Sequence, residues 1–171
     1  VSFVFSMIIV GFGQGIVPLV SFSFGARERK LAAGIRNTTM KLVTGAAVAT
    51  FLIMSLISGR YCGIFSDSKT VVQMVIPGLR IQMSSFAFAG INTIASFYFT
   101  AIGRAKESAV ISASRGLVVL LLAIMILPAL MGITGVWFVS LITETVTLVL
   151  SIVYMKRESA ISVRTNVYDI P

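Results

Sequence analysis

Apolar blocks long enough to cross a lipid bilayer dominate this sequence and restrict what it can fold into. A hydrocarbon core of about 30 Å takes about 20 helical residues, each adding about 1.5 Å. None of the blocks alternates apolar and polar residues as a membrane β-strand does. The sequence therefore predicts an all-α membrane protein with five transmembrane helices, at approximately residues 4–26, 40–58, 79–103, 109–130 and 133–155, followed by a polar tail over 156–171.

Composition and charge agree with this class and indicate how the helices are oriented. Hydrophobic residues make up 57% of the chain, charged residues only 12%, and the mean hydropathy is +0.98. The net charge of +8 would favour nucleic acid as a partner in a soluble protein, but all except three of the 14 Lys and Arg residues fall on one predicted side of the membrane. Basic loops face the cytoplasm, so we expect the chain to start outside and end inside, with lipid headgroups as the partners of these residues.

The sequence lacks the residues that several kinds of chemistry need. The chain contains one cysteine and no histidine, which argues against a disulfide framework, a zinc site and a histidine proton relay. No phosphate-binding GxxxxGK[ST] loop is present, so ATP-driven work is not expected. We predict a protein that is not an enzyme and holds no metal or cofactor. The chain begins with Val1, and we expect it to be a piece of a longer protein whose missing part lies upstream.

Polar residues on the last predicted span mark the first candidate site. Ser140, Glu144, Thr147 and Ser151 recur at intervals of four, three and four, which places them on one face of a helix. Glu144 lies about 11 residues from each end of the span, hence about 15 Å deep. It is predicted to be the only charge at that depth, with Arg115 reaching the headgroups from a span end. Glu144 is therefore a candidate proton or cation site, or else a neutral acid that holds neighbouring helices together.

The third predicted span carries a weaker version of the same pattern. Ser85, Asn92 and Ser96 align at spacings of seven and four, among several aromatic residues. Such a face lines the cavity of a transporter or packs closely against another helix. Asn92 is the residue of this span that we single out.

The first predicted span contains residues that weaken helices. Gly11 and Gly15 form a GxxxG pair, which lets another helix approach closely, and Pro18 is expected to kink the helix at mid-depth. A bent helix with a polar inner face suits an alternating-access transporter better than a static anchor. The residues that share this face are Gln14, Pro18, Ser21 and Gly25.

Several motifs in one order resemble the multidrug and toxic compound extrusion (MATE) transporters. The run GQGIVPLVSFSFGAR is similar to the G-x-x-P-L-[IV]-[SG]-[YF]-[NS]-[YF]-G-A pattern in the second span of a MATE lobe. The resemblance continues through FSDSKTVVQMVIPGLRIQ, GINTIASFYFTAIGRAKES, SASRG and GITGVWFVSLITETVT. It covers nearly the whole chain apart from the polar tail.

The resemblance implies a protein of twelve spans in two six-helix lobes, of which this chain supplies the last five spans. The missing N-terminal lobe of the same protein is then a partner. The pattern looks most like a bacterial branch that exports cationic amphipathic compounds across the inner membrane, driven by H⁺ or Na⁺. An acid often occupies the position of Glu144 in that branch. The passage residues implied here are Glu144, Gln14, Ser21, Asn92, Ser96 and Thr147.

Two other functions remain open from the sequence. One is a flippase or exporter of lipid-linked or polysaccharide precursors, a related architecture whose cavity should be strongly basic. The other is a membrane scaffold or truncated remnant that transports nothing. A scaffold would fill the inner helix faces with apolar packing.

Overall fold

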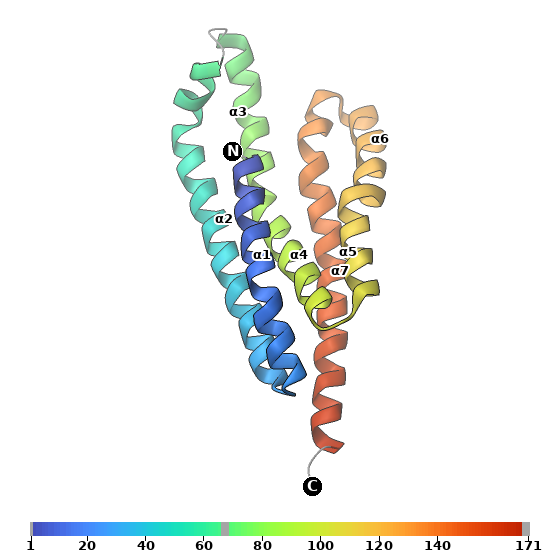
Figure 1. Cartoon of the computed structure of the whole chain (residues 1–171). Helices are drawn as coiled ribbons and strands as arrows, with labels where there is room; N and C mark the ends of the chain where they lie inside the picture. Colours follow the sequence, from blue (N-terminus) through green and yellow to red (C-terminus); the bar gives the residue numbers. More distant parts are fainter. Residues whose placement is uncertain (1, 66–68, 169–171) are drawn as a thin grey trace.

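The computed structural model describes residues 2–65 and 69–168, which form an array of long helices (Figure 1). The predicted all-α class is confirmed. In chain order the elements are α1 (Ser2–Gly25), α2 (Arg29–Phe65), α3 (Lys69–Ser84), α4 (Phe86–Ala101), α5 (Ala105–Ala113), the π-helical turn η1 (Ser114–Val118), α6 (Val119–Met131) and α7 (Ile133–Tyr168).

Within the described residues, four helical stretches are long and apolar enough to cross a membrane. They are Phe3–Gly25, Arg29–Ile57, Ala105–Met131 and Ile133–Ala160. The predicted span over residues 79–103 differs, because the chain there is divided between α3 and α4, which have 16 residues each. This part of the chain is therefore two shorter helices, and a membrane crossing over residues 79–103 stays a prediction.

Serine hydroxyls accompany the break between α3 and α4. Ser84 Oγ donates to the carbonyl of Ile81 at 2.7 Å, and Ser85 Oγ donates to that of Gln82 at 2.7 Å. The Ser85 amide also turns to the Gln82 carbonyl, at 3.3 Å. Serine side chains compete in this way for carbonyls that a continuous α-helix would use, and they often bend helices. The break places Ser85 where it can contact α7.

The segment predicted as a polar tail, 156–171, is also different. Helix α7 continues to Tyr168, and no Gly or Pro interrupts the sequence between Gly135 and Pro171. Glu158 is buried in this extension and pairs with Arg36 of α2, with 3.5 Å between Nη1 and Oε2. The Arg36 guanidinium lies 4.7 Å from the centre of the Tyr98 ring of α4. Glu158 thus ties the start of the extension to α2, at the end of the molecule that carries the C-terminus (Figure 1).

Helix α4 connects the two halves of the array. It packs against α1 and α2 on one side and against α5 and α7 on the other, as Figure 1 shows. Its residues Ile94, Tyr98 and Phe99 are almost completely buried. Large apolar side chains on the outer faces are exposed instead, including Phe22 at 80% and Leu56 at 87%. This distribution suits helices that are surrounded by lipid.

The turn between α6 and α7 is short, as the sequence predicted, and the two helices run antiparallel (Figure 1). Gly132 has φ of +61° and closes α6 through its amide, which donates to the Pro128 carbonyl at 2.9 Å. Gly135 then passes so close to α6 that a Cβ there would overlap the backbone carbonyl group of Leu127. Backbone atoms cannot move aside as a side chain can, so this contact requires glycine.

We predict that Gly135→Ala separates α6 from α7 and destabilises the protein by about 1–3 kcal/mol, the usual cost of overpacking. The measurement is thermal unfolding in detergent. Gly45→Ala is the matched control, because a Cβ at Gly45 meets nothing within 4 Å. Equal melting temperatures for the two variants would contradict the predicted contact.

Candidate functional site

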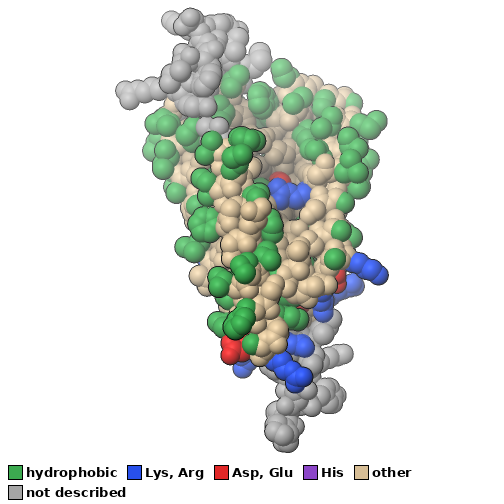
Figure 2. All heavy atoms as spheres, in the orientation of Figure 1, with side chains coloured by type: hydrophobic (Ala, Val, Ile, Leu, Met, Phe, Trp, Pro, Cys, Tyr) green, Lys and Arg blue, Asp and Glu red, His purple; other side chains and the backbone are tan. Residues whose placement is uncertain are grey.

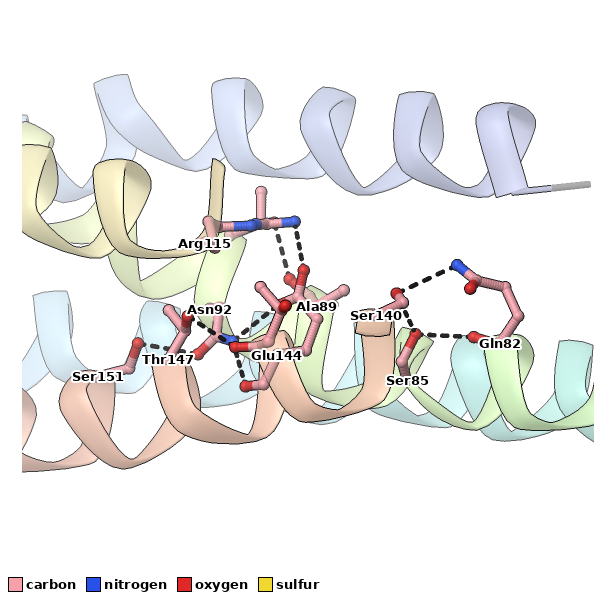
Figure 3. Close-up of polar contacts among 11 residues, drawn as sticks. Gln82, Ser85, Ala89, Asn92, Arg115, Ser140, Glu144, Thr147 and Ser151 are labelled. Atoms are coloured by element: carbon pink, nitrogen blue, oxygen red, sulfur yellow. Dashed lines mark hydrogen bonds and ion pairs between the residues drawn. The ribbon is translucent and has the colours of Figure 1, made fainter. Parts of the chain in front are cut away.

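A buried polar cluster lies where α4, α7 and η1 meet, and Glu144 is its centre (Figure 3). Glu144 is 8% exposed, and its neighbours Thr147 and Ser151 on α7 are fully buried. The predicted polar stripe of the last span therefore faces the interior of the helix array. A stripe of this kind is stable in an apolar bundle only when each polar group finds a partner.

Asn92 of α4 supplies the first partner of the carboxylate. Its Nδ2 donates to Glu144 Oε2 at 2.8 Å and to the Glu144 backbone carbonyl at 2.9 Å. Its Oδ1 accepts from the Ser151 hydroxyl at 2.9 Å. Both ends of the amide are thus bonded to α7, which fixes the position of Glu144 relative to α4.

Arg115 of η1 supplies the second partner, from a different side of the carboxylate (Figure 3). Its Nη2 lies 3.0 Å from Glu144 Oε1, and its Nη1 donates to the Thr93 hydroxyl. Thr93 in turn donates to the Ala89 carbonyl at 2.7 Å. The carboxylate is therefore shared, with Oε2 held by an amide and Oε1 held by a cation.

The expectation that Arg115 reaches the headgroups and that Glu144 is the only charge at its depth is wrong. The cause is η1, since a π-helical turn inserts a residue into the helical register and redirects the side chains that follow. The available signal was the arginine itself, because an ionisable residue inside a membrane segment usually faces an oppositely charged one.

The cluster opens on one side. The Arg115 side chain is 28% exposed, against 10% for Glu144. Figure 2 shows a basic and an acidic side chain together in a hollow on this face of the molecule, about midway along the helices. The acid is thus covered by the cation, and the cation is accessible.

A second polar group extends the cluster along α7 (Figure 3). Ser140 Oγ lies 3.1 Å from Ser85 Oγ and accepts from Gln82 Nε2 at 3.1 Å. Gln82 was not among the predicted site residues, because it lies before the break between α3 and α4. Its bond to Ser140 of α7 became visible only in the structure.

The sequence of this chain matches one protein family. The sequence model of the MatE family matches residues 1–125. The chain belongs to the MatE family. No solved structure gives a significant match.

Curated relatives of this MatE chain include multidrug export proteins of staphylococci. It is 27% identical over 154 residues to the multidrug export protein MepA of Staphylococcus saprophyticus. It is 26% identical over 154 residues to the proteins of that name in Staphylococcus aureus strains RF122 and MRSA252. Each match covers 89% of this chain but only 34% of the relative, so the chain spans about a third of their length. The all-α architecture is therefore that of a fragment of a MatE family membrane protein.

In the described part of this MatE chain, the remaining predicted passage residues make no bond to Glu144. Thr147 donates to the Thr143 carbonyl of its own helix at 2.9 Å. Gln14 and Ser21 are exposed on α1, where Ser21 donates to the Ala101 carbonyl at 2.9 Å. Ser96 belongs to a separate hydroxyl group between α4 and α5, which includes Thr100, Ser108 and Ser112.

The face of α1 that carries Gly11 and Gly15 was predicted to contact another helix, but no helix covers it in the described part of the chain. A Cβ at Gly11, Gly15 or Gly25 would meet nothing within 4 Å, and α1 continues through Pro18. The glycine of α1 that packs closely is Gly13, where a Cβ would overlap the Phe97 ring. Use of Gly11 and Gly15 as a contact seam stays a prediction about a partner outside this chain. The open surface is a shallow apolar groove lined by Ile8, Gly11, Phe12, Gly15, Ile16 and Leu19.

We predict that Asn92→Ala destabilises the protein by about 1–3 kcal/mol for each buried group left unpaired, here Glu144 Oε2 and the Ser151 hydroxyl. Thermal unfolding followed by the fluorescence of Trp137, the one tryptophan of the chain, measures the loss. Thr145→Ala is the control, because this exposed hydroxyl bonds only to its own helix in the structure. If both variants unfold at the same temperature, Asn92 does not hold the cluster together.

Proposed function

We propose that the chain is part of a secondary transporter that exports cationic amphipathic compounds in exchange for H⁺ or Na⁺. The observation that carries the proposal is the buried Glu144 of α7, paired with the more exposed Arg115. A charge at such a depth is costly in lipid and usually marks a pathway for ions or substrates. The names of the relatives, multidrug export protein, support the same conclusion.

Electrostatics favour a cation as the transported species. A carboxylate in a medium of low dielectric constant attracts a positive charge much more strongly than it does in water. The apolar surfaces around the hollow suit the hydrophobic part of an amphipathic molecule. A flippase of anionic lipid precursors would need a clear excess of positive charge, and the one cation of this cluster, Arg115, is already paired with an acid.

Export also requires the rest of the protein. Alternating access moves two groups of helices relative to each other around a central site. The proposed arrangement places this chain in the C-terminal lobe, with its last residues in the cytoplasm of a bacterial cell. The missing N-terminal lobe then forms the other wall of the passage. By itself the chain is expected to move no substrate.

The test uses membrane vesicles that contain the complete open reading frame carrying this chain, loaded with a fluorescent cationic dye. A pH gradient and a sodium gradient are imposed separately, which also identifies the coupling ion. We predict that Glu144→Gln lowers gradient-driven dye export at least tenfold, the factor that about 1.4 kcal/mol of lost interaction produces.

The matched control is Glu107→Gln, which removes an acid from the partly exposed Arg104–Glu107 pair. Its export rate should equal that of the unmodified protein. Unchanged export by the Glu144 variant, with normal expression, would remove this residue from the proposed mechanism.

A further inference from the structure

The position that a transported cation would take beside Glu144 is already occupied by part of the protein. Arg115 Nη2 lies 3.0 Å from Oε1, and the other side of the carboxylate is closed by Asn92. Among the described residues, Arg115 is the one charged side chain that pairs with Glu144. The groups that face the carboxylate from α4 are neutral. A free cation that approaches Oε1 from this side therefore competes with Arg115.

Three features show that the arginine can leave without collapse of the site. Asn92 holds Oε2 and the backbone of Glu144 independently of Arg115. The guanidinium contacts the carboxylate through Nη2 and directs Nη1 to Thr93, so the strong two-point pairing of arginine with a carboxylate is not formed. Finally, Arg115 lies on a π-helical turn and is the exposed member of the pair.

We infer that the Arg115 guanidinium is a tethered cation that occupies the binding position formed by Glu144 Oε1 and the Thr93 hydroxyl, and that an exported cation binds there by displacing it. The inference rests on the proposed function. The exchange conserves charge at the carboxylate, because one cation replaces another while Arg115 moves toward the hollow. Arg115 is thus a specificity-determining residue.

The geometry also indicates a class of substrate. A position that holds a guanidinium offers one charged and one neutral acceptor to a planar, weakly hydrated cation with delocalised charge. Compact, strongly hydrated ammonium ions should replace Arg115 less readily, because they lose more hydration on entering. Planar aromatic cations are therefore the expected substrates, and ethidium is a suitable probe.

The experiment measures ethidium affinity by fluorescence polarisation, using the complete open reading frame in nanodiscs. If Arg115 leaves the binding position empty in about one unmodified molecule in ten, its removal makes the position available in every molecule. We therefore predict that Arg115→Gln binds ethidium about tenfold more tightly than the unmodified protein. Glu144→Gln should lose most of the affinity. Arg104→Gln, which removes a cation from the partly exposed pair with Glu107, should change nothing.

Two further variants guard against misfolding. In the double variant Arg115→Gln and Glu144→Gln no buried charge is left unpaired, so it should fold but bind ethidium weakly. Arg115→Lys keeps the charge without the planar fork and should bind ethidium with an affinity between those of the unmodified protein and Arg115→Gln. If Arg115→Gln does not fold, the ethidium affinity of Arg115→Lys tests the inference by itself.

The outcomes separate the inference from the function on which it rests. Tighter ethidium binding by Arg115→Gln, lost in the double variant, supports the tethered cation. Unchanged or weaker binding by the Arg115 variants, while Glu144→Gln still loses affinity, overturns the tethered cation and leaves the proposed function standing. Full ethidium affinity in Glu144→Gln overturns the proposed function.

Discussion

The structure depends on one constraint: polar groups between apolar helices must find their partners inside the protein. Burying an unpaired amide costs roughly 2–7 kcal/mol, and an unpaired charge costs far more. Asn92 meets this requirement for three groups of α7 at once, namely the Glu144 carboxylate, the Glu144 carbonyl and the Ser151 hydroxyl. The relative position of α4 and α7 follows, because any shift along the helix axis would break these bonds together.

The same constraint acts at the end that carries the C-terminus, with a different result. Arg36 and Glu158 have side chains only 7% and 6% exposed, and Tyr98 lies against the guanidinium. Each of the three belongs to a different helix. Removing one partner of such a pair would leave a buried charge, so this cluster ties α2, α4 and α7 together. The Arg115–Glu144 pair is more open, and this contrast separates a structural ion pair from one that can exchange its cation.

The sequence predicted those parts of the site that depend on regular helical spacing. The stripe on α7 and the prominence of Asn92 required only a period of 3.6 residues and the cost of polar groups in lipid. Arg115 was misplaced because a π-helical turn depends on tertiary contacts that spacing does not encode. The break at Ser85 and the helical extension beyond residue 155 were missed for a related reason. Serine bonds to the backbone and a buried Glu158 become evident only when neighbouring helices are in place.

The distribution of regular and irregular backbone around the site supports an acid that stays and a cation that moves. Glu144 lies on α7, whose 36 residues are uninterrupted, and it is bound to α4 through Asn92. Arg115 lies on η1, beside Gly116, between two shorter helices. A π-helical turn is an irregular element that is often found at functional sites, so η1 is a suitable place for a side chain that must leave its partner. If both residues were on rigid helices, a cation could enter only by separating those helices. With the arginine on the irregular element, exchange at Glu144 begins with a movement of the Arg115 side chain, while Asn92 keeps the acid in place on α7.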